Sequence, residues 1–352
     1  MSGKFMIYGA TGYTGKLLAR TSKALGLEPL LAARNSAKLK SVAGQHGFAF
    51  KTIDLNDGAA LRIALADVDA VLHAAGPFSA TSKPMLDACL ETRTHYLDVT
   101  GELDVLEACA ERDAEAQRAG IMVMPGVGFD CVPSDCLAAH LKQRMPDANQ
   151  LNMAIGGKLL VSRGSARTGI EMLPKGVRAR RGGEIVVLTD LPERSFDFGQ
   201  GMRPTRVVGL GDMCPAFHST GIPEMTFFYE MQPSMAAVAN TGPGAFKRWL
   251  LGRGFMQSKL KRRIEAMPEG PNDAQRKEGY AIIVAEALNA KGERITSRLR
   301  TPEGYTMTAM ASLEILQRLF KGEGAMGYQT PSRVFGAGFI TEFDGCTLQD
   351  ID

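Results

Sequence analysis

Several side chains that can donate or accept a proton follow two apolar runs of the sequence. The stretch YLDVTGE supplies the phenol of Tyr96 and the carboxylates of Asp98 and Glu102, and the later stretch GVGFDCVPSD supplies Asp130. Such groups act as general acids and bases. Any of these groups of the first stretch is a candidate proton donor or acceptor, and Asp130 is a candidate acid or substrate anchor. For Asp98 and Thr100, a role in capping the following helix is an equally open interpretation.

A glycine-rich loop stands near the start of the chain. The sequence GATGYTG of residues 9–15 follows the apolar run 5–8 and opens a helical pattern. At such a place the first glycine relieves the turn, the second lets the backbone approach a pyrophosphate, and the third lets helix and strand pack closely. The amides and the dipole of the helix N-terminus then favour bound phosphates. The loop predicts a dinucleotide site, and the alternative is a glycine-rich turn of another α/β domain.

The first charged residue after the second apolar run indicates which dinucleotide binds. Arg34 follows the run 29–33, whereas NAD enzymes usually carry Asp or Glu near this point for the ribose hydroxyls. Because a guanidinium suits a 2′-phosphate, we predict NADP(H) as the cofactor. The residues assigned to cofactor binding are Gly9, Thr11, Gly12, Tyr13, Thr14, Gly15, Arg34, Asn35, Asp54, Ala75, Gly76, Pro77, Gly128 and Phe129.

The elements that must position these residues form a regular alternation over the first 145 residues. Short apolar runs alternate with amphipathic stretches, which is typical of a parallel sheet covered by helices. The predicted strands are 5–8, 29–33, 49–52, 70–74, 95–98 and 122–124, and the predicted helices are 12–25, 36–46, 57–66, 82–91 and 103–119. Ligands of such a sheet bind outside the carboxyl ends of its strands, where the loops described above begin.

The pattern changes to β-rich segments from about residue 151. Strands are predicted at 184–188, 225–231, 280–287 and 293–299, with a hairpin turn at 289–292. Helical periodicity returns at 306–320, and we expect that helix to rejoin the first domain. The predicted fold class is α/β. It comprises an N-terminal Rossmann domain with a doubly wound parallel sheet (1–146), a mixed α/β substrate and dimerisation domain with a largely antiparallel sheet (147–305), and a C-terminal segment returning to the Rossmann domain (306–352).

Composition argues against several classes of protein. A formal charge of +3 over 352 residues is no basic excess, so we expect no nucleic-acid partner. The six cysteines form no CxxC pair and no Cys/His cluster with zinc spacing, which favours reduced thiols and no bound metal. A strand begins by Phe5 and no apolar run reaches the roughly 18 residues of a spanning helix, so we expect a cytoplasmic protein without a signal peptide.

One segment departs from this background. Residues 246–264 carry seven basic residues before the first acid, Glu265, and include the only tryptophan, Trp249. A basic segment with apolar side chains can lie on a membrane surface or bind an acidic partner such as a carrier protein. The alternative is a solvated helix beside the active site, because Gly252 and Gly254 interrupt the helical pattern.

Together these motifs resemble a known family. GATGYTG, AARN at 32–35, AAGPF at 74–78, HYLDVTGE at 95–102 and GFDCVPSD at 128–135 are similar to the saccharopine dehydrogenase-like NADP-binding superfamily. GFDCVPSD, the pattern PEGYTMTA at 302–309 and YQTP at 328–331 resemble its trans-acting enoyl reductase branch. The resemblance implies a Rossmann domain, a mixed α/β substrate domain, NADPH as reductant, and reduction of an acyl double bond.

Three functional hypotheses follow. The first is an NADPH-dependent reductase of an activated C=C bond in an acyl or similar apolar substrate, either small or carrier-bound, in an expected homodimer. The second, implied by the resemblance to saccharopine dehydrogenases, is imine or secondary-amine redox chemistry, with Tyr96 and Asp130 at the matching positions. The third is a non-catalytic NADP-binding or partner-binding protein, because no tyrosine has a lysine four residues later and no GxSxG motif is present.

Overall fold

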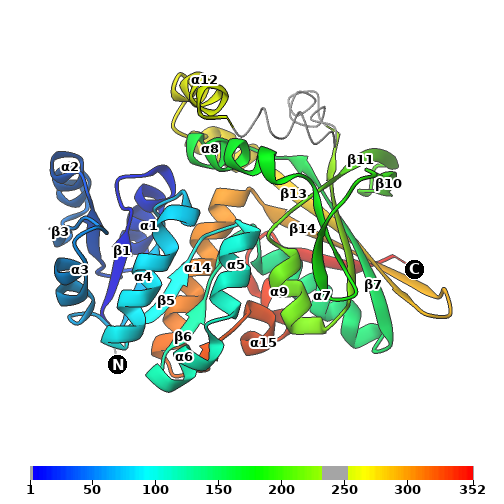
Figure 1. The fold of residues 1–352 in the computed structure, drawn as a ribbon, viewed down its shortest axis with the longest axis horizontal. Coiled ribbons are helices and arrows are strands. Elements are labelled where there is room, and N and C mark those ends of the chain that lie inside the picture. Colours follow the sequence, from blue (N-terminus) through cyan, green and yellow to red (C-terminus); the bar gives the residue numbers. More distant parts are fainter. Residues whose placement is uncertain (1–2, 232–252, 352) are drawn as a thin grey trace. The chain divides into compact units, whose positions relative to one another are not determined.

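The computed structural model describes residues 3–231 and 253–351 (Figure 1). The chain divides into two units. Unit 1 comprises Met1–Val132 and Tyr305–Phe335, and unit 2 comprises Pro133–Gly304 and Gly336–Asp352. The predicted fold class is confirmed, since unit 1 is built on a parallel sheet and unit 2 on a mixed sheet.

The sheet of unit 1 has the strand order β15-β6-β5-β4-β1-β2-β3, and its paired strands are parallel. This contains the Rossmann order 3-2-1-4-5-6. Its strands are β1 (Phe5–Tyr8), β2 (Leu30–Ala33), β3 (Phe50–Thr52), β4 (Ala70–His73), β5 (His95–Asp98), β6 (Met122–Met124) and β15 (Gly327–Tyr328). The central strands are apolar without alternation because both faces of the sheet are covered. In β1, for example, all four side chains are buried.

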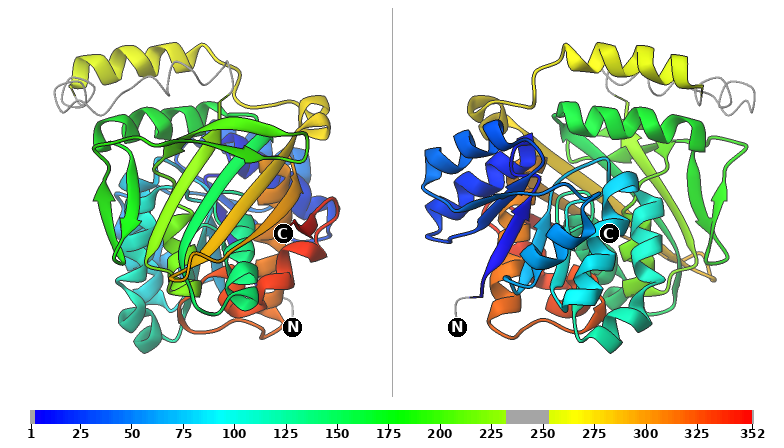
Figure 2. Two further views of the ribbon diagram at one scale, coloured as in Figure 1. Left: turned by 90° about the vertical axis from the view of Figure 1, so that its right-hand side faces the viewer. Right: turned by 60° about the vertical axis from the view of Figure 1, so that its left-hand side comes forward.

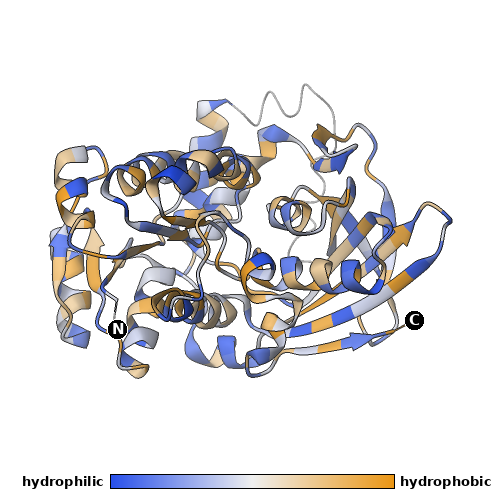
Figure 3. Cartoon of the chain, turned by 90° about the horizontal axis from the view of Figure 1, so that it is seen from below, coloured by the Kyte–Doolittle hydropathy of each residue, from blue (hydrophilic) through white to orange (hydrophobic). Residues whose placement is uncertain are grey.

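Helices lie on both sides of this sheet (Figure 3). They are α1 (Tyr13–Ala24), α2 (Ser36–His46), α3 (Gly58–Leu65), α4 (Phe78–Thr92), α5 (Leu103–Ala110), α6 (Asp113–Ala119), α14 (Gly304–Phe320) and α15 (Pro331–Phe335). The late helix predicted at 306–320 corresponds to α14, whose residues from Tyr305 onward lie in unit 1. Its last residue, Phe320, packs against Phe5 of β1 with ring centroids 6.3 Å apart.

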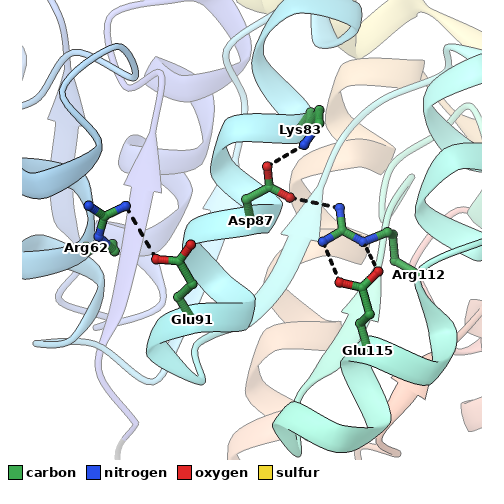
Figure 4. A network of polar contacts seen from close by, with 6 residues as sticks. All are labelled: Arg62, Lys83, Asp87, Glu91, Arg112 and Glu115. Carbon is green, nitrogen blue, oxygen red and sulfur yellow. Dashed lines mark hydrogen bonds and ion pairs between the residues drawn. The ribbon is translucent and has the colours of Figure 1, made fainter.

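The stretch 103–119, predicted as one helix, forms α5 and α6 with a break before Asp113. The side chain of Arg112 lies at this break and pairs with Glu115 at 2.5 Å and with Asp87 of α4 at 2.8 Å. Burial opposes the ionised form of Asp87, but hydrogen bonds from Lys83 and Arg112 outweigh it and lower the pKa of that carboxyl. Figure 4 shows this network, which ties α4 to the break, beside a pair between Arg62 of α3 and Glu91 of α4.

The sheet of unit 2 is mixed, with the order β10-β11-β12-β7-β13-β14-β16 and with β8 and β9 attached through β12. Its long strands lie side by side in Figure 2. Strands β7 and β12 are parallel, and the neighbours β7 and β13 are antiparallel. The strands are β7 (Ala148–Lys158), β8 (Arg178–Arg181), β9 (Glu184–Val187), β10 (Glu193–Asp197), β11 (Met202–Val208), β12 (Glu224–Glu230), β13 (Tyr280–Asn289), β14 (Arg294–Pro302) and β16 (Thr347–Asp350).

The predicted hairpin is present between β13 and β14. Asn289 Oδ1 accepts hydrogen bonds from the amides of Lys291 (3.1 Å) and Glu293 (3.0 Å). Gly292 has a φ of 82°, a conformation that favours glycine. Unit 2 also contains α7 (Val132–Arg144), α8 (Arg163–Met172), α9 (Met213–Thr220), α12 (Gly254–Glu265), α13 (Asp273–Glu278) and the 3₁₀ helices η1 (Leu173–Lys175) and η3 (Ala337–Glu342).

The two units differ from the predicted domains at two places. Residues 133–144 of α7, which lie within the predicted domain 1–146, fall in unit 2. The end of the chain, predicted to return to the Rossmann domain, divides after Phe335. The last part joins unit 2 because β16 pairs with β14 in an antiparallel register. Both differences depend on contacts between distant segments, which local periodicity does not report.

The basic segment 246–264 falls partly outside the described residues. Its second half contributes to α12, which is linked to α8 by ion pairs between Lys261 and Glu171 (2.5 Å) and between Arg167 and Glu265 (3.4 Å). Within the parts of the chain that the structure covers, we find no helix with the length and apolar character needed to cross a bilayer. Contact of this segment with a membrane or an acidic partner stays a prediction.

Candidate active site

The loop after β1 has the geometry that a bound pyrophosphate requires. Gly9 has a φ of 90°, and a Cβ there would lie 2.7 Å from the carbonyl carbon of Ala74. A Cβ on Gly15 would lie 2.7 Å from Ala10 Cα and even nearer to the carbonyl oxygen of Gly9. Gly12 differs, since its Cβ would meet nothing closer than 3.4 Å, and no side chain caps α1 there. The uncapped helix start and the space beside Gly12 fit a dinucleotide phosphate.

We predict that Gly15→Ala destabilises unit 1 and weakens NADPH binding. The added methyl group would press on backbone atoms of Gly9 and Ala10, which cannot turn aside as a side chain can. We expect a loss of about 1–3 kcal/mol of unfolding free energy, measured by chemical denaturation. Gly44→Ala in α2 is the matched control, because its Cβ would meet nothing within 4 Å and alanine favours a helix. Equal stability of the two variants would contradict the packing role of Gly15.

Arg34 is the first residue after β2 and is exposed. Among the described residues it makes no hydrogen bond or ion pair. It lies close enough to Tyr8 for its charge to oppose the effect of burial, which raises the pKa of that phenol to about 12. A guanidinium that is exposed and not already paired is available to a 2′-phosphate. This placement agrees with the role predicted for Arg34.

Two other predicted cofactor residues accept hydrogen bonds from nearby backbone amides. Asn35 Oδ1 accepts a hydrogen bond from the amide of Lys38 (3.0 Å) and caps α2. Asp54, which is exposed after β3, accepts one from the amide of Asn56 (2.9 Å). These bonds explain why both residue types occur at these turns without a ligand. Their contact with the cofactor stays a prediction.

The loop after β4 contains Ala75, Gly76 and Pro77. Side chains that precede and follow these residues hold the loop in place. Thr81 Oγ1 lies 2.7 Å from the carbonyl oxygen of Ala75 and 3.1 Å from that of Pro77. His73, at the end of β4, is buried and lies 3.1 Å from the same hydroxyl. Burial lowers the pKa of His73 to about 3, so this imidazole is neutral and structural. The loop is therefore held from within, while Gly76 itself is exposed.

Glu102 fixes the start of α4, the helix that follows the loop of residues 75–77. Its carboxylate is buried and accepts hydrogen bonds from the amides of Phe78 (2.8 Å) and Ser79 (2.9 Å). An anion at this position satisfies the open amides of α4 and favours its dipole. This contact explains why α4 begins at Phe78, earlier than its predicted start at residue 82. The residues 98–102 and 75–79 are thus joined at the carboxyl edge of the sheet.

Tyr96 and Asp98 form a buried pair. The hydroxyl of Tyr96 donates to Asp98 Oδ2 (2.5 Å), and Asp98 Oδ1 accepts from the amides of Thr100 and Gly126 (2.9 Å each). Burial, more than any other cause, raises the pKa of Tyr96 well above its usual value and that of Asp98 to about 6. Asp98 thus joins the loops after β5 and β6 instead of capping α5, which begins after Glu102. A proton-donor role for Tyr96 stays a prediction, and its complete burial favours a supporting role.

We expect Asp98 to make the protein less stable as pH rises. The pKa of aspartate in an unfolded chain is about 3.9, and the pKa of Asp98 in the folded chain is about 6. Between these values the folded state binds more protons, so the unfolding free energy falls with increasing pH. Asp98→Asn should flatten this slope between about pH 4 and pH 6, measured by urea unfolding across that range. An unchanged slope would contradict the raised pKa.

Asp130 differs from the buried pair because its side chain is exposed. Among the described residues its carboxylate makes no hydrogen bond or ion pair. Desolvation by the surrounding protein raises its pKa to about 6. A carboxyl group with this property near neutral pH can both give and take a proton. Of the two predicted catalytic residues, Asp130 is the exposed one, and its catalytic role stays a prediction.

The loop that carries Asp130 is held by a residue far along the chain. The amide of Phe129 donates to Thr308 Oγ1 of α14 (3.0 Å). Cys131 is buried, so its thiol is not a reactive group at the surface. Sequence reasoning identified neither Thr308 nor the cap formed by Glu102. The motif PEGYTMTA contained a signal for Thr308, but only the tertiary contact shows its role.

Arginines of unit 2 that could bind an acidic group lie in β8. Arg178 and Arg180 are 8% and 3% exposed. The guanidinium of Arg180 stacks 4.0 Å from the ring centre of Phe217 and donates to the carbonyl of Gly183 (2.5 Å). Arg181 donates to the carbonyl of Met225 (3.1 Å). These side chains form part of the packing of unit 2.

Comparison with known proteins agrees with this geometry. Residues 5–124 match the family described as the saccharopine dehydrogenase NADP binding domain. A trans-acting enoyl reductase of Mycobacterium leprae is 30% identical over 151 residues, which cover 40% of this chain and 35% of that protein. A saccharopine dehydrogenase-like oxidoreductase of Arabidopsis thaliana is 29% identical over 147 residues, covering 37% and 32%. The chain thus matches about a third of the length of these relatives.

Solved structures share the fold over nearly the whole chain. A saccharopine dehydrogenase (L-Glu forming) of Saccharomyces cerevisiae has a TM-score of 0.66 and 14% identity, covering 99% of this chain and 100% of that one. A homospermidine synthase of Legionella pneumophila in complex with NAD has a TM-score of 0.62 and 11% identity, covering 100% and 92%. At these identities the likeness concerns the fold alone. Residues 5–124 are thus similar to the saccharopine dehydrogenase NADP binding domain, and this match supports NADP(H), the predicted cofactor.

Proposed function

We propose that this protein is an NADPH-dependent reductase of an activated C=C bond in an acyl or similar apolar substrate. The observation that carries the proposal is Asp130, an exposed carboxyl with a raised pKa at the carboxyl edge of an NADP-binding sheet. Substrates of such sheets bind at this edge. The similarity to trans-acting enoyl reductases supports a C=C bond as the target.

Different residues of unit 1 bind the cofactor, transfer the proton and support the loops. NADPH, when bound, supplies a hydride to the β-carbon of the acyl group. The loop of residues 9–15 would hold the pyrophosphate, and Arg34 would hold the 2′-phosphate. Asp130 in its acid form delivers a proton to the α-carbon, so that hydride and proton together complete the saturated product. Asp98 and Glu102 keep the neighbouring loops in place.

Imine reduction is a second candidate, favoured by the charge around Asp130. No arginine or lysine pairs with this carboxylate within the described part of the chain. An unpaired carboxylate stabilises a nearby cation, and the iminium formed from an oxo acid and an amine is such a cation. In that reaction the hydride goes to carbon, and the nitrogen becomes a secondary amine.

A direct assay separates these chemistries. NADPH consumption is followed with crotonyl-CoA as an enoyl thioester and, in parallel, with mixtures of an oxo acid and a primary amine. Saturated acyl product from the first supports the leading proposal, and a secondary amine from the second supports the alternative. If tight NADPH binding occurs without turnover across a broad panel of both classes, the non-catalytic hypothesis replaces the two enzymatic ones.

The setting of this activity is also a proposal. We place the protein in the cytoplasm as a homodimer that acts on a small or carrier-bound acyl substrate. The six cysteines, which are all buried free thiols, are compatible with a reducing compartment. Light scattering of the purified chain measures the oligomeric state, and a monomeric mass would contradict the homodimer.

A further inference from the structure

The first turns of α14 contact two loops of unit 1 that the proposed function uses. The ring of Tyr305 packs edge-on against the ring of Tyr13, with centroids 4.9 Å apart and planes at 86°. One turn later, Thr308 Oγ1 accepts the hydrogen bond from the amide of Phe129 (3.0 Å). Residues three apart share one face of a helix. The motif PEGYTMTA therefore links the phosphate loop after β1 to the Asp130 loop after β6.

Thr308 lies directly against the backbone just before Asp130. A Cβ on Gly128 would lie 3.0 Å from both Oγ1 and Cγ2 of Thr308. The threonine is largely buried, so water competes little for the hydrogen bond between its hydroxyl and the Phe129 amide. The hydrogen bond and the close packing together fix the backbone from Gly128 to Phe129, and thus the point from which the Asp130 side chain extends.

A second residue fixes the other end of that side chain. A Cβ on Gly101 would lie 2.5 Å from Asp130 Oδ2 and 2.9 Å from its Cγ. The carboxyl therefore rests against the backbone of the loop after β5, in a place that only glycine leaves open. Any larger residue at 101 would force Asp130 into another rotamer.

We infer that Thr308 and Gly101 are positioning residues that together set the place of the Asp130 carboxyl, Thr308 through the loop backbone and Gly101 through the space it leaves. The inference rests on the proposed function for its consequence in turnover, but its structural part is independent of the reaction. Misplacement of a reacting group by about 1 Å can cost on the order of 10²-fold in rate. Both residues should therefore affect turnover more than cofactor binding.

The structural part is tested by hydrogen exchange of the peptide containing Phe129. Thr308→Val keeps the branched shape but removes the acceptor, so the Phe129 amide should lose protection. Thr308→Ser keeps the acceptor and should restore it. Thr92→Val, the same change at a helix threonine whose hydroxyl bonds to the Ala88 carbonyl, is the matched control. Wild-type protection in a folded Thr308→Val variant overturns the inference.

Gly101→Ala tests the carboxyl itself. Its clash is with a movable side chain, so the variant should fold, keep protection at Phe129, and show a displaced Asp130 carboxyl in a crystal structure. An unmoved carboxyl overturns the role of Gly101.

Kinetics then separate the inference from the proposed function. With the substrate found by the NADPH assay, Thr308→Val and Gly101→Ala should lower kcat by about 10–10²-fold. Gly101→Ala should do so with NADPH affinity unchanged, and Thr308→Ser should recover most of the rate. If Asp130→Asn keeps full turnover while Thr308→Val loses protection, the role of Asp130 in the proposed function fails and the structural inference stands. If Asp130→Asn is inactive while Thr308→Val and Gly101→Ala turn over normally, the inference fails and the proposed function stands.

Discussion

Asp130→Asn should lower the turnover number by about 10²–10⁴-fold and leave NADPH binding unchanged. The amide has nearly the size of the carboxyl but does not transfer a proton at neutral pH. Asp130 is exposed and makes no hydrogen bond or ion pair among the described residues, so the replacement breaks no structural contact there. The measurement is steady-state kinetics with the best substrate, together with a cofactor titration.

The pH dependence gives this prediction a second test. With a pKa of about 6, the acid form of Asp130 declines above that pH, so the wild-type rate should fall as pH rises from about 6 to 8. The residual rate of Asp130→Asn should not show this decrease with rising pH. Asp67→Asn is a suitable control, since Asp67 is a surface carboxylate that pairs only loosely with Lys51 at 3.9 Å. A variant with wild-type turnover would remove Asp130 from the chemistry.

Arg34→Asp should weaken NADPH binding by about 10²-fold and change NADH binding little. The replacement removes charge-assisted hydrogen bonds to the 2′-phosphate, each worth about 1.5–3 kcal/mol, and adds a repulsive charge. NADH has no such phosphate, so it loses only a minor contact. Isothermal titration of both cofactors at one ionic strength measures the two effects side by side.

A control variant must separate the position of Arg34 from the general effect of replacing a positive charge by a negative one. Arg93→Asp makes the same change at the C-terminus of α4, where Arg93 is exposed with a φ of 59°, a conformation that aspartate tolerates. That variant should bind both cofactors as the wild type does. If Arg34→Asp weakens NADPH and NADH equally, Arg34 is not the residue that recognises the 2′-phosphate.

The sequence predicted the parallel sheet well because its signals are local. Strands buried on both faces are short apolar runs, as in β1 and β4, and the glycine spacing of residues 9–15 places a tight turn between strand and helix. The exposed position of Arg34 just after β2 was likewise predictable, and its contact with the cofactor stays a prediction. These features depend on neighbours in the chain, so periodicity and motif spacing are enough to find them.

The errors arose where distant residues decide the structure. The amides at the start of α4 are held by Glu102, and the break between α5 and α6 lies where Arg112 pairs with Asp87. The sequence also did not show that the hydroxyl of Tyr96 points to the buried Asp98. The contact between Phe129 and Thr308 spans 179 residues. None of these contacts leaves a periodic signal in one sequence.

The most direct test of the central claim is a titration of the purified protein with NADPH and with NADH, following nicotinamide fluorescence at fixed ionic strength. The geometry of residues 9–15 and the free position of Arg34 predict saturable binding that is tighter for NADPH. Absence of binding by either dinucleotide, or tighter binding of NADH, would contradict an NADPH-dependent reductase.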